Sequence, residues 1–486
     1  MLGAAVLAFF FCLNLKDSSA PPVGRSLGRL PVASTGNDNG FFILWGICES
    51  PATDPLSGEF RRRVLSLLAP FPSELEFRRR YGDWLDRTND NFRRYWKGAA
   101  IPFPRGDSGD SGEFFLSRRA LIEKKEKEFA LLLHRFQALL SAGRIEDFTP
   151  PGRELPLRNL LLAINASRIF IAANTVKALI GEPDKRSAAT DNLLLSLAAG
   201  LKLIRSSRTL AVNFLGKTLA DQSLRALAAL LNRPALAAAI AVRVCGFLPP
   251  RRTEEFGTSS VRHSGTLSFI QALERIRREK VIDVRLLPGY FRWSANVYAI
   301  ERLINKADPR TAQALQALLS FFLLKNETVG VFAKYWESVG RLEETPPWRW
   351  RSEPRALELD MTAGSFWWLR NPLGKMMVHS AVPHVRTVTL NFVYRTYESQ
   401  VRYELVRILS AFRCAAPGAP EREKERNLKR FLQAAAERDP FSGGPYRYSV
   451  SRRVLYSVGP DRRDDGGMER EAFWRASDIA IPALVF

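Results

Sequence analysis

Apolar residues recur at every third or fourth position through most of the chain from residue 41 to residue 340. This spacing is typical of helices that bury one face. It predicts helices over residues 115–140, 155–180, 188–205, 209–231, 235–245, 266–278, 295–305, 311–324 and 329–339. The breaks between consecutive helices are short, which favours antiparallel neighbours. We therefore expect a mainly α fold built as a stack of helical hairpins, either an irregular α-solenoid or a bundle.

The pattern changes toward the end of the chain. A stretch rich in Pro and Trp at 345–354 indicates a boundary, and helices are predicted beyond it over 384–412 and 421–438. From residue 439 to residue 478, turn signals alternate with short β-prone runs such as Tyr-Arg-Tyr-Ser-Val and Arg-Val-Leu-Tyr-Ser-Val. This alternation predicts a small C-terminal antiparallel β module.

These patterns divide the chain into five predicted segments. They are a membrane anchor or signal segment at 1–20, a linker at 21–38, a helical domain at 39–344, a helical connecting region at 345–438 and the β module at 439–486.

The apolar run at 2–15 has about the length of a signal-peptide core and is shorter than a usual spanning helix. No Lys or Arg precedes it. Ser18 and Ala20 are small enough for a cleavage site, but Pro21 and Pro22 follow directly and argue against cleavage. We expect an uncleaved signal-anchor, a transmembrane segment of the inner membrane with the body on the periplasmic side. A cleaved signal and an ordinary buried helix are the alternatives.

The chain is strongly basic, with 72 Lys and Arg against 50 Asp and Glu, a net charge of +22 and a pI of about 10.2. Arginines dominate the excess and are scattered in short groups such as 61–63 and 78–80, which is typical of solvated faces and ion pairs. The sequence has no Lys/Arg tail, RNP-type strand motif or zinc-finger spacing, so it argues against a nucleic-acid partner. An anionic polymer or lipid surface bound through the net charge is a weaker alternative.

The cysteines other than Cys12 are Cys48, Cys245 and Cys414, which are far apart and form no Cys-x-x-Cys pair. Their spacing predicts neither a zinc site nor a disulfide framework. We interpret them as buried apolar side chains.

One segment fits a relaxed phosphate-loop pattern, Ala-Val-Asn-Phe-Leu-Gly-Lys-Thr at 211–218. A phosphate loop needs a preceding strand and a glycine-rich, non-helical backbone. The flanking residues here are apolar at helical spacing instead. We therefore interpret Lys217 as part of a helix interior.

Aromatic and histidine residues near the predicted boundary are candidates for a groove. Trp367 and Trp368 are predicted either to line a groove for a peptide or glycan, together with the tryptophans at 348–350, or to pack between the helices and the β module. His379 and His384 are the only close histidine pair, but they are five residues apart, unlike metal ligands on one helix face. No catalytic residue is predicted.

The β module carries the most specific motif. It contains Asp-Pro-Phe-Ser-Gly-Gly-Pro-Tyr-Arg-Tyr at 439–448, Arg-Val-Leu-Tyr-Ser-Val-Gly-Pro-Asp-Arg-Arg-Asp-Asp-Gly-Gly at 453–467 and Asp-Ile at 478–479. This block resembles the C-terminal β region of type II secretion major pseudopilins, which holds calcium. The resemblance implies calcium ligands at Asp461, Asp464 and Asp465. Arg462 and Arg463 depart from the glycine-rich turn of that family, and the N-terminal methylation motif is absent. The alternative is a hairpin whose aspartates accept turn N–H groups.

More broadly, the chain resembles large, uncharacterised bacterial envelope proteins that begin with a membrane segment. The matching residues lie at 38–46, 54–55, 322–330 and 371–375 and in the terminal block. The resemblance implies location and architecture but brings no activity. We expect a non-catalytic binding or assembly scaffold with protein partners in the envelope, linked to secretion or pilus-type machinery. The alternative is an envelope-polymer hydrolase or metal-dependent enzyme with its site between the helical body and the tail.

Overall fold

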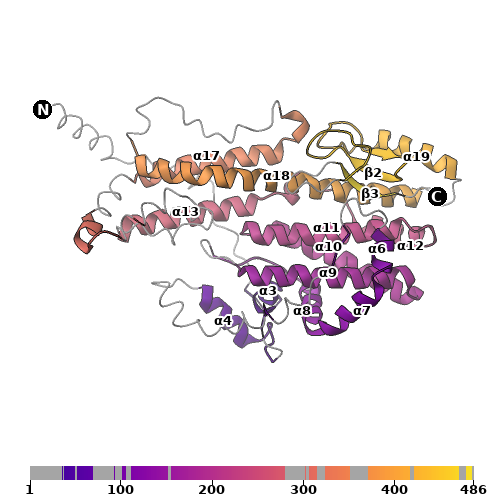
Figure 1. Ribbon diagram of the computed structural model, residues 1–486, viewed down its shortest axis with the longest axis horizontal. Helices are drawn as coiled ribbons and strands as arrows, with labels where there is room; N and C mark the ends of the chain where they lie inside the picture. Colours follow the sequence, from indigo (N-terminus) through magenta and orange to yellow (C-terminus); the bar gives the residue numbers. More distant parts are fainter. Residues whose placement is uncertain are drawn as a thin grey trace.

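The computed structural model describes residues 35–36, 38–49, 52–68, 92–93, 101–104, 111–150, 155–279, 302, 306–314, 323–350, 370–415, 421–469 and 478–483. The apolar run at 2–15 and the linker up to residue 34 lie outside these residues. The described chain is mainly α with a small antiparallel sheet, which confirms the predicted fold class (Figure 1).

Four helices joined by short turns follow one another through the middle of the chain. They are α9 (Leu157–Ile180), α10 (Pro183–Ser206), α11 (Leu210–Leu231) and α12 (Pro234–Phe247). Pro183 and Pro234 occupy the first turns of their helices, where a missing N–H costs nothing. Thr209 caps α11 by accepting a hydrogen bond from the Val212 N–H at 3.2 Å. The helices predicted here are confirmed, with small shifts at their ends.

A close helix crossing joins α10 to α11 at two glycines. A Cβ atom on Gly216 would lie 2.8 Å from the Gly200 carbonyl oxygen and 2.8 Å from the Ile204 nitrogen. The two backbones therefore approach as closely as they do only because neither position carries a side chain. This crossing falls inside the segment that fits the phosphate-loop pattern, and the helix-interior interpretation of that segment is confirmed.

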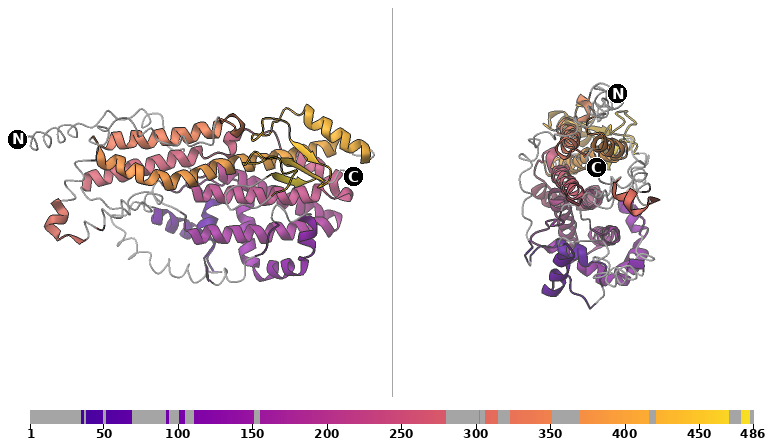
Figure 2. Two further views of the ribbon diagram at one scale, coloured as in Figure 1. Left: turned by 45° about the horizontal axis from the view of Figure 1, so that its top comes forward. Right: turned by 90° about the vertical axis from the view of Figure 1, so that its left-hand side faces the viewer.

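The last long helix, α18 (Pro372–Ala415), extends well beyond the predicted 384–412. It packs against α11 and α12 and also against α17 (Lys325–Glu344), which packs in turn on α13 (Ser259–Glu279). Because α18 returns to helices far away in sequence, the stack is a bundle rather than a solenoid. The long helices run roughly along one axis and give an elongated body (Figure 2).

The helix predicted over 115–140 is wrong as a single element. The structure divides this region into α6 (Ser111–Leu116), α7 (Arg119–Glu128) and α8 (Ala130–Ser141). The backbone leaves helical geometry at Arg118 and at Phe129, whose φ and ψ are −108° and 23°. The turns let α6 pack on α9 and α11 while α8 packs on α9 and α10, and hydrophobic periodicity does not report such changes of direction.

Several shorter elements complete the described chain. They are α3 (Phe41–Gly46), α4 (Gly58–Leu68), α19 (Glu421–Ala434) and the 3-10 turns η1 (Thr253–Phe256) and η3 (Pro347–Arg349).

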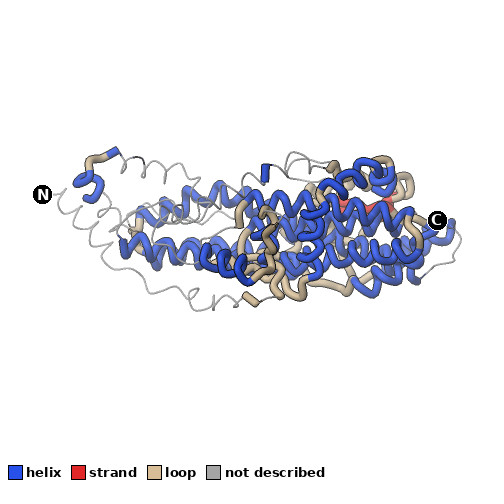
Figure 3. The backbone as a smooth tube through the Cα atoms, turned by 90° about the horizontal axis from the view of Figure 1, so that it is seen from below, coloured by secondary structure: helices blue, strands red, loops and turns tan. Residues whose placement is uncertain are grey.

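The predicted β module is confirmed as a three-stranded antiparallel sheet in the order β1 (Arg447–Ser449), β2 (Val454–Ser457), β3 (Ile479–Pro482). Leu455 in the central strand pairs with Tyr448 on one side and Ile481 on the other. Leu455, Ile479 and Ile481 are buried. The strands lie near one end of the bundle, beside α18 (Figure 3).

Among the described residues, α9 is the one helix long and apolar enough to cross a membrane, with a mean hydropathy of 1.3 over its most apolar part. However, 83% of that part is buried inside the protein, and the core helix of a soluble protein has the same properties.

Candidate functional site

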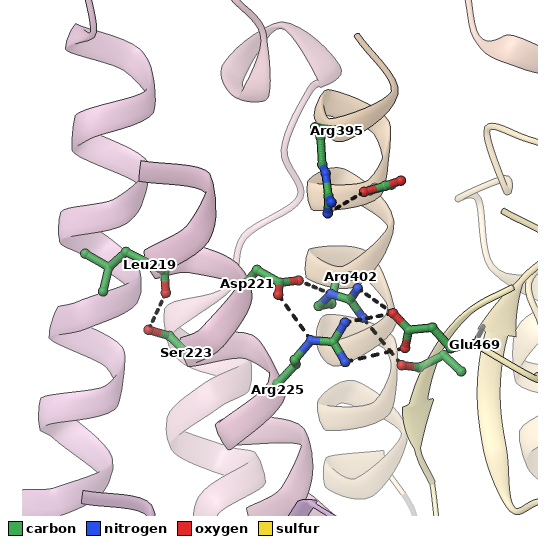
Figure 4. A network of polar contacts seen from close by, with 9 residues as sticks. Leu219, Asp221, Ser223, Arg225, Arg395, Arg402 and Glu469 are labelled. Atoms are coloured by element: carbon green, nitrogen blue, oxygen red, sulfur yellow. Dashed lines mark hydrogen bonds and ion pairs between the residues drawn. The ribbon is translucent and has the colours of Figure 1, made fainter. Parts of the chain in front are cut away.

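Four charged side chains meet where the β module rests on α11 and α18. Asp221 and Arg225 belong to α11, Arg402 belongs to α18, and Glu469 follows the second strand. We call this group the ionic clasp (Figure 4). Arg225 contacts Asp221 at 3.1 Å and Glu469 at 2.7 Å, and Arg402 contacts Asp221 and, at 3.1 Å, Glu469. Each arginine therefore bridges both carboxylates.

The clasp joins three separate parts of the chain. Asp221 and Arg225 are four residues apart on a helix otherwise dominated by Leu and Ala, so they share one face. Arg402 also donates to the Ala480 carbonyl of β3 at 3.5 Å. The side chains of Arg402 and Glu469 are only 5% and 6% exposed. Arg225 is 15% exposed, and Asp221, at 34%, is the member of the group nearest to water. Arg402 and Glu469 lie in the buried part of the group, where an unpaired charge would be costly.

The pKa values of the clasp carboxyls follow from this pairing. Burial alone raises the pKa of Asp221, but Arg402 and Arg225 outweigh it and bring the value down to about 2. The same balance lowers the pKa of Glu469. Both carboxyls are therefore ionised at neutral pH, and both form ion pairs.

A third carboxyl, beside the clasp, behaves differently. Glu398 pairs with Arg395 at 3.0 Å on the preceding turns of α18. Burial raises its pKa, with Arg395 and Arg402 opposing and the carboxylates of Asp221 and Glu469 adding to the rise. Glu398 forms an ion pair with the exposed Arg395, whereas Asp221 and Glu469 each contact both Arg225 and Arg402. The weaker pairing and the two nearby carboxylates make Glu398 harder to ionise than either of them.

Two further polar contacts connect α18 to the β module and the segment before it. Tyr446 donates to the Glu404 carboxylate, which also accepts a hydrogen bond from Gln400 at 2.8 Å. Arg407 pairs with Glu437 just before the module. Burial raises the pKa of Glu404, against the effect of the two donors. Together with the ionic clasp, these contacts place charged anchors along the C-terminal half of α18.

The Asp-Pro-Phe-Ser-Gly segment has a structural explanation in Asp439. Its buried carboxylate accepts hydrogen bonds from the backbone N–H of Phe441 at 2.9 Å and of Val458 at 3.3 Å, and from the hydroxyls of Ser442 and Ser457. Asp439 therefore ties its own turn to the end of β2. The Asp-Pro-Phe-Ser and Leu-Tyr-Ser-Val segments are therefore connected, because residues of both donate hydrogen bonds to the Asp439 carboxylate.

The tryptophans at 348 and 350 lie between the helices and the β module. The backbone N–H of Trp348 donates to the Pro440 carbonyl at 3.1 Å, and the indole ring of Trp348 covers Gly443. Trp350 packs edge-on against Tyr394 and Tyr397 of α18, with ring centroids 5.5 and 6.3 Å away. These contacts favour the packing interpretation for the two residues, and Trp348 remains 43% exposed. Trp367 and Trp368 lie outside the described residues.

The predicted calcium ligands are spread around one turn. Asp461 accepts the Arg463 N–H at 3.0 Å, while Asp464 accepts the Gly466 N–H and the Tyr456 hydroxyl, each at 3.0 Å, and pairs with Arg447. Among the described residues, no three His, Cys, Asp or Glu side chains are grouped so as to hold a metal ion. Calcium binding stays a prediction, and the hydrogen bonds favour the turn alternative.

A buried aspartate lies beside the predicted calcium ligands. Asp478, fully buried at the start of β3, accepts the Gly467 N–H at 2.6 Å through one oxygen. Its other oxygen has no hydrogen-bond partner within the described chain. Burial raises its pKa to about 6; the N–H groups of Gly467 and Asp465 oppose this rise, and the carboxylates of Asp464 and Asp465 add to it.

The other predicted residues do not gather into one site. His379 and His384 fall on the α18 backbone, but their side chains lie outside the described part of the structure. Lys217 is buried in α11, where its Nζ donates to Thr396 Oγ1 at 2.8 Å. Burial lowers its pKa to about 8, opposed by Glu343.

A pocket of about 300 Å³ lies between α8 and the loop after α3, and the exposed His134 lines it. The neighbouring Arg135 also lines the pocket. It donates to the carbonyls of Glu49 at 2.8 Å and Thr53 at 2.9 Å and so holds the loop in place. The pocket is lined mainly by apolar side chains, and the residues that line it form no motif that would define a ligand.

Comparisons of the chain with known proteins found no relative: no protein-family model, curated protein or solved structure matches it. The resemblance to the pseudopilin β region therefore remains a prediction carried by the quoted motifs.

Sequence reasoning missed the ionic clasp. The signal that it left is weak: Asp221 and Arg225 stand four apart in an otherwise apolar helix, and Arg402 lies in a run of aromatic and aliphatic residues. A charged residue in such a run is either a surface residue or a buried ion pair, and the choice depends on a partner far away in sequence.

Proposed function

We propose that the protein is a non-catalytic assembly scaffold of the bacterial envelope, anchored in the inner membrane, that carries its β module in a fixed orientation on an elongated helical body. The ionic clasp carries this proposal, because buried charges from α11, α18 and the module hold the module against the bundle. A partner then meets a preorganised surface made of both parts, and a preorganised surface binds with less loss of entropy.

The envelope location rests on the sequence. The apolar run at 2–15, followed by a linker rich in Pro, Gly and Ser, supports a membrane-anchored body on the periplasmic side. The pseudopilin-like motif of the β module supports a link to secretion or pilus-type machinery, with protein partners in the envelope.

Cell fractionation tests the location. We expect the untagged protein in the inner-membrane fraction, and protease added to spheroplasts should digest its body while a cytosolic marker survives. A variant without residues 2–15 should remain protected in the cytosol. Recovery of the wild-type protein in the soluble cytosolic fraction would overturn the proposal.

In-cell crosslinking of the full-length protein tests the scaffold role. Crosslinked envelope proteins should be recovered with the wild type and depleted with Arg402→Met, which loosens the module without touching the anchor. Arg243→Met is the matched control, because the Arg243–Asp191 pair is exposed and lies away from the module. Equal recovery with all three proteins would show that the fixed orientation of the module is irrelevant to binding.

A further inference from the structure

A basic surface lies where the turn after β2 meets the 3-10 turn η3. The guanidinium of Arg462, in the first of these turns, donates to the Pro347 carbonyl, and its Cζ lies 5.9 Å from the ring centroid of Trp350. On η3 itself, the Arg349 guanidinium lies over the Trp348 indole, with 4.8 Å between Cζ and the ring centroid. We call the side chains of Trp348, Arg349 and Arg462 the junction patch.

The junction patch is built from both parts of the molecule. Trp348 and Arg349 follow α17 of the helical body, whereas Arg462 belongs to the β module. The Trp348 ring also lies against Gly443 of the module, where a Cβ atom would be 2.8 Å from the indole. The patch therefore keeps its arrangement only while the module rests on the body.

The junction patch offers positive charge to solvent. All three of its side chains are exposed. Neither Arg349 nor Arg462 forms an ion pair within the described part of the chain, and Asp464 of the same turn is already paired with Arg447. A guanidinium presents N–H donors in a plane, which match a carboxylate in both geometry and charge.

The backbone of Arg462 gives a second reason to assign its side chain a role. Its φ is 59°, in the left-handed region that glycine adopts without cost and other residues seldom adopt. The pseudopilin family has a glycine-rich turn at the matching place. An arginine held at such a position costs free energy, and residues with strained backbones concentrate at functional sites.

We infer that the junction patch binds an acidic segment of a partner protein, with carboxylates paired to Arg349 and Arg462 and an apolar side chain against the exposed part of the Trp348 ring. The inference rests on the proposed scaffold function and names the chemistry of the partner. Gly443 and Arg349 already lie against the indole, so the guanidiniums are the more available groups. Guanidiniums favour carboxylates over the neutral hydroxyls of a glycan.

Fluorescence anisotropy on the full-length protein at physiological salt tests the inference. The probe is a short labelled peptide of alternating Glu and Val, and the same peptide with Gln in place of Glu is its control. The Glu peptide should bind and the Gln peptide should not. Arg349→Gln combined with Arg462→Gly should raise the Kd of the Glu peptide about tenfold or more, because two charge-assisted contacts are lost.

The matched control variant combines Arg426→Gln with Arg430→Gln. Both arginines are exposed on α19, so the net charge falls by the same amount as in the junction variant. The Kd should change by less than about twofold, since charges away from the binding site are screened at this salt concentration. Equal weakening by the two double variants would reduce the binding to a general attraction and overturn the inference.

The position of the peptide is tested by photo-crosslinking. A benzophenone-bearing Glu peptide should crosslink to η3 and to the turn after β2. Arg462→Gly retains the turn, because glycine adopts its φ readily. Arg349→Glu, at an exposed position, should abolish binding without lowering the thermal midpoint, and it decides the question if the double variant fails to fold.

Three further outcomes would overturn the inference: no binding of the Glu peptide, equal binding of the Gln peptide, or a neutral chito-oligosaccharide that binds at the junction patch in place of the peptide. Failure of the peptide to bind, with envelope partners still depleted by Arg402→Met in cells, would overturn this inference alone. Peptide binding by a protein found in the cytosol would instead overturn the proposed envelope function alone.

Discussion

At the scale of single residues, the charged side chains whose burial costs the most free energy lie where the β module meets the bundle. The ionic clasp brings together Asp221, Arg225, Arg402 and Glu469, and each charge contacts two of opposite sign. Removing one member of such a group leaves another charge buried with less compensation. This loss destabilises a protein far more than the loss of an exposed ion pair.

A double-mutant cycle measures this coupling. We expect Arg402→Met to lower the free energy of unfolding by about 3 kcal/mol, and its coupling to Glu469→Gln to exceed about 1 kcal/mol. Arg243 and Asp191 form the control pair, with exposed fractions of 44% and 54%, and their coupling should stay below about 1 kcal/mol. Urea denaturation gives both values. Equal coupling in the two pairs would contradict a buried clasp.

Asp478 makes stability depend on pH. Its pKa in the folded protein is about 6, above the ordinary value, so its stabilising contribution is complete below about pH 4 and is lost as the pH rises through 6. Asp478→Asn should therefore match the wild type at pH 4 and be more stable at pH 8 by about 3 kcal/mol. Thermal unfolding across this range measures the difference, with Asp461→Asn as the exposed control. A difference independent of pH would contradict the assignment.

The limits of sequence prediction are clearest at this scale. Lys217 could be placed in a helix interior from its apolar flanks alone. The clasp could not be found, because Glu469 comes from a segment remote from α11, and periodicity carries no information on which distant segments meet. The groove candidates Trp367, Trp368, His379 and His384 remain predictions.

At the scale of elements, the sequence predicts helices better than it predicts their turns. The central helices were recognisable from their apolar spacing and the short breaks between them. The predicted start at residue 188 falls after Pro183, where α10 begins. The three strands were recognisable from turn residues between β-prone runs. The division of 115–140 into three helices was not recognisable from the sequence. Arg118 and Phe129 are not residue types that end helices, and the bends follow from packing.

The α10/α11 crossing gives a prediction at this scale. Gly216→Ala should destabilise the protein by about 2 kcal/mol, because the new methyl group would press on the backbone of α10. Gly246→Ala in α12 is the matched control: nothing lies within 4 Å of its Cβ position, so it should be neutral or stabilising by up to about 1 kcal/mol. Equal effects of the two substitutions in thermal unfolding would refute the close crossing.

The turn after β2 gives a second prediction at the scale of elements. Because Asp464 is already engaged by Arg447, Tyr456 and the Gly466 N–H, we expect millimolar calcium to leave the thermal midpoint unchanged. Differential scanning fluorimetry of the full-length protein, with calcium and with a chelator, measures this. A rise with calcium that Asp464→Ala removes would instead establish the calcium site implied by the pseudopilin resemblance.

At the scale of the whole molecule, α18 connects the parts. Its 44 residues correspond to about 66 Å of helix, and they pack on α11, α12, α17 and the sheet. The bundle and the β module therefore share one long element as well as the clasp. We expect them to unfold together rather than as separate units.

Hydrogen exchange tests this cooperativity. In the wild type, the amides of β2 should be protected to the same extent as those of α11. In Arg402→Met, the amides of β2 and those in the centre of α9 should exchange faster by the same factor, about tenfold or more, because a loss of 1.4 kcal/mol in a shared opening free energy already corresponds to a factor of ten. Acceleration confined to the strand amides would show that the β module opens separately from the bundle.

The ionic clasp also constrains the order in which the protein matures. Asp221 and Arg225 leave the ribosome long before Glu469 does, so α11 and α18 can meet while one of the two clasp carboxylates is still to be synthesised. Until then two arginines face a single aspartate, and the surface meant for the β module remains open. A chain that ends before Glu469 would leave that surface exposed, with two arginines facing one aspartate. Cellular quality control could recognise such a truncated chain by this exposed, unbalanced charge.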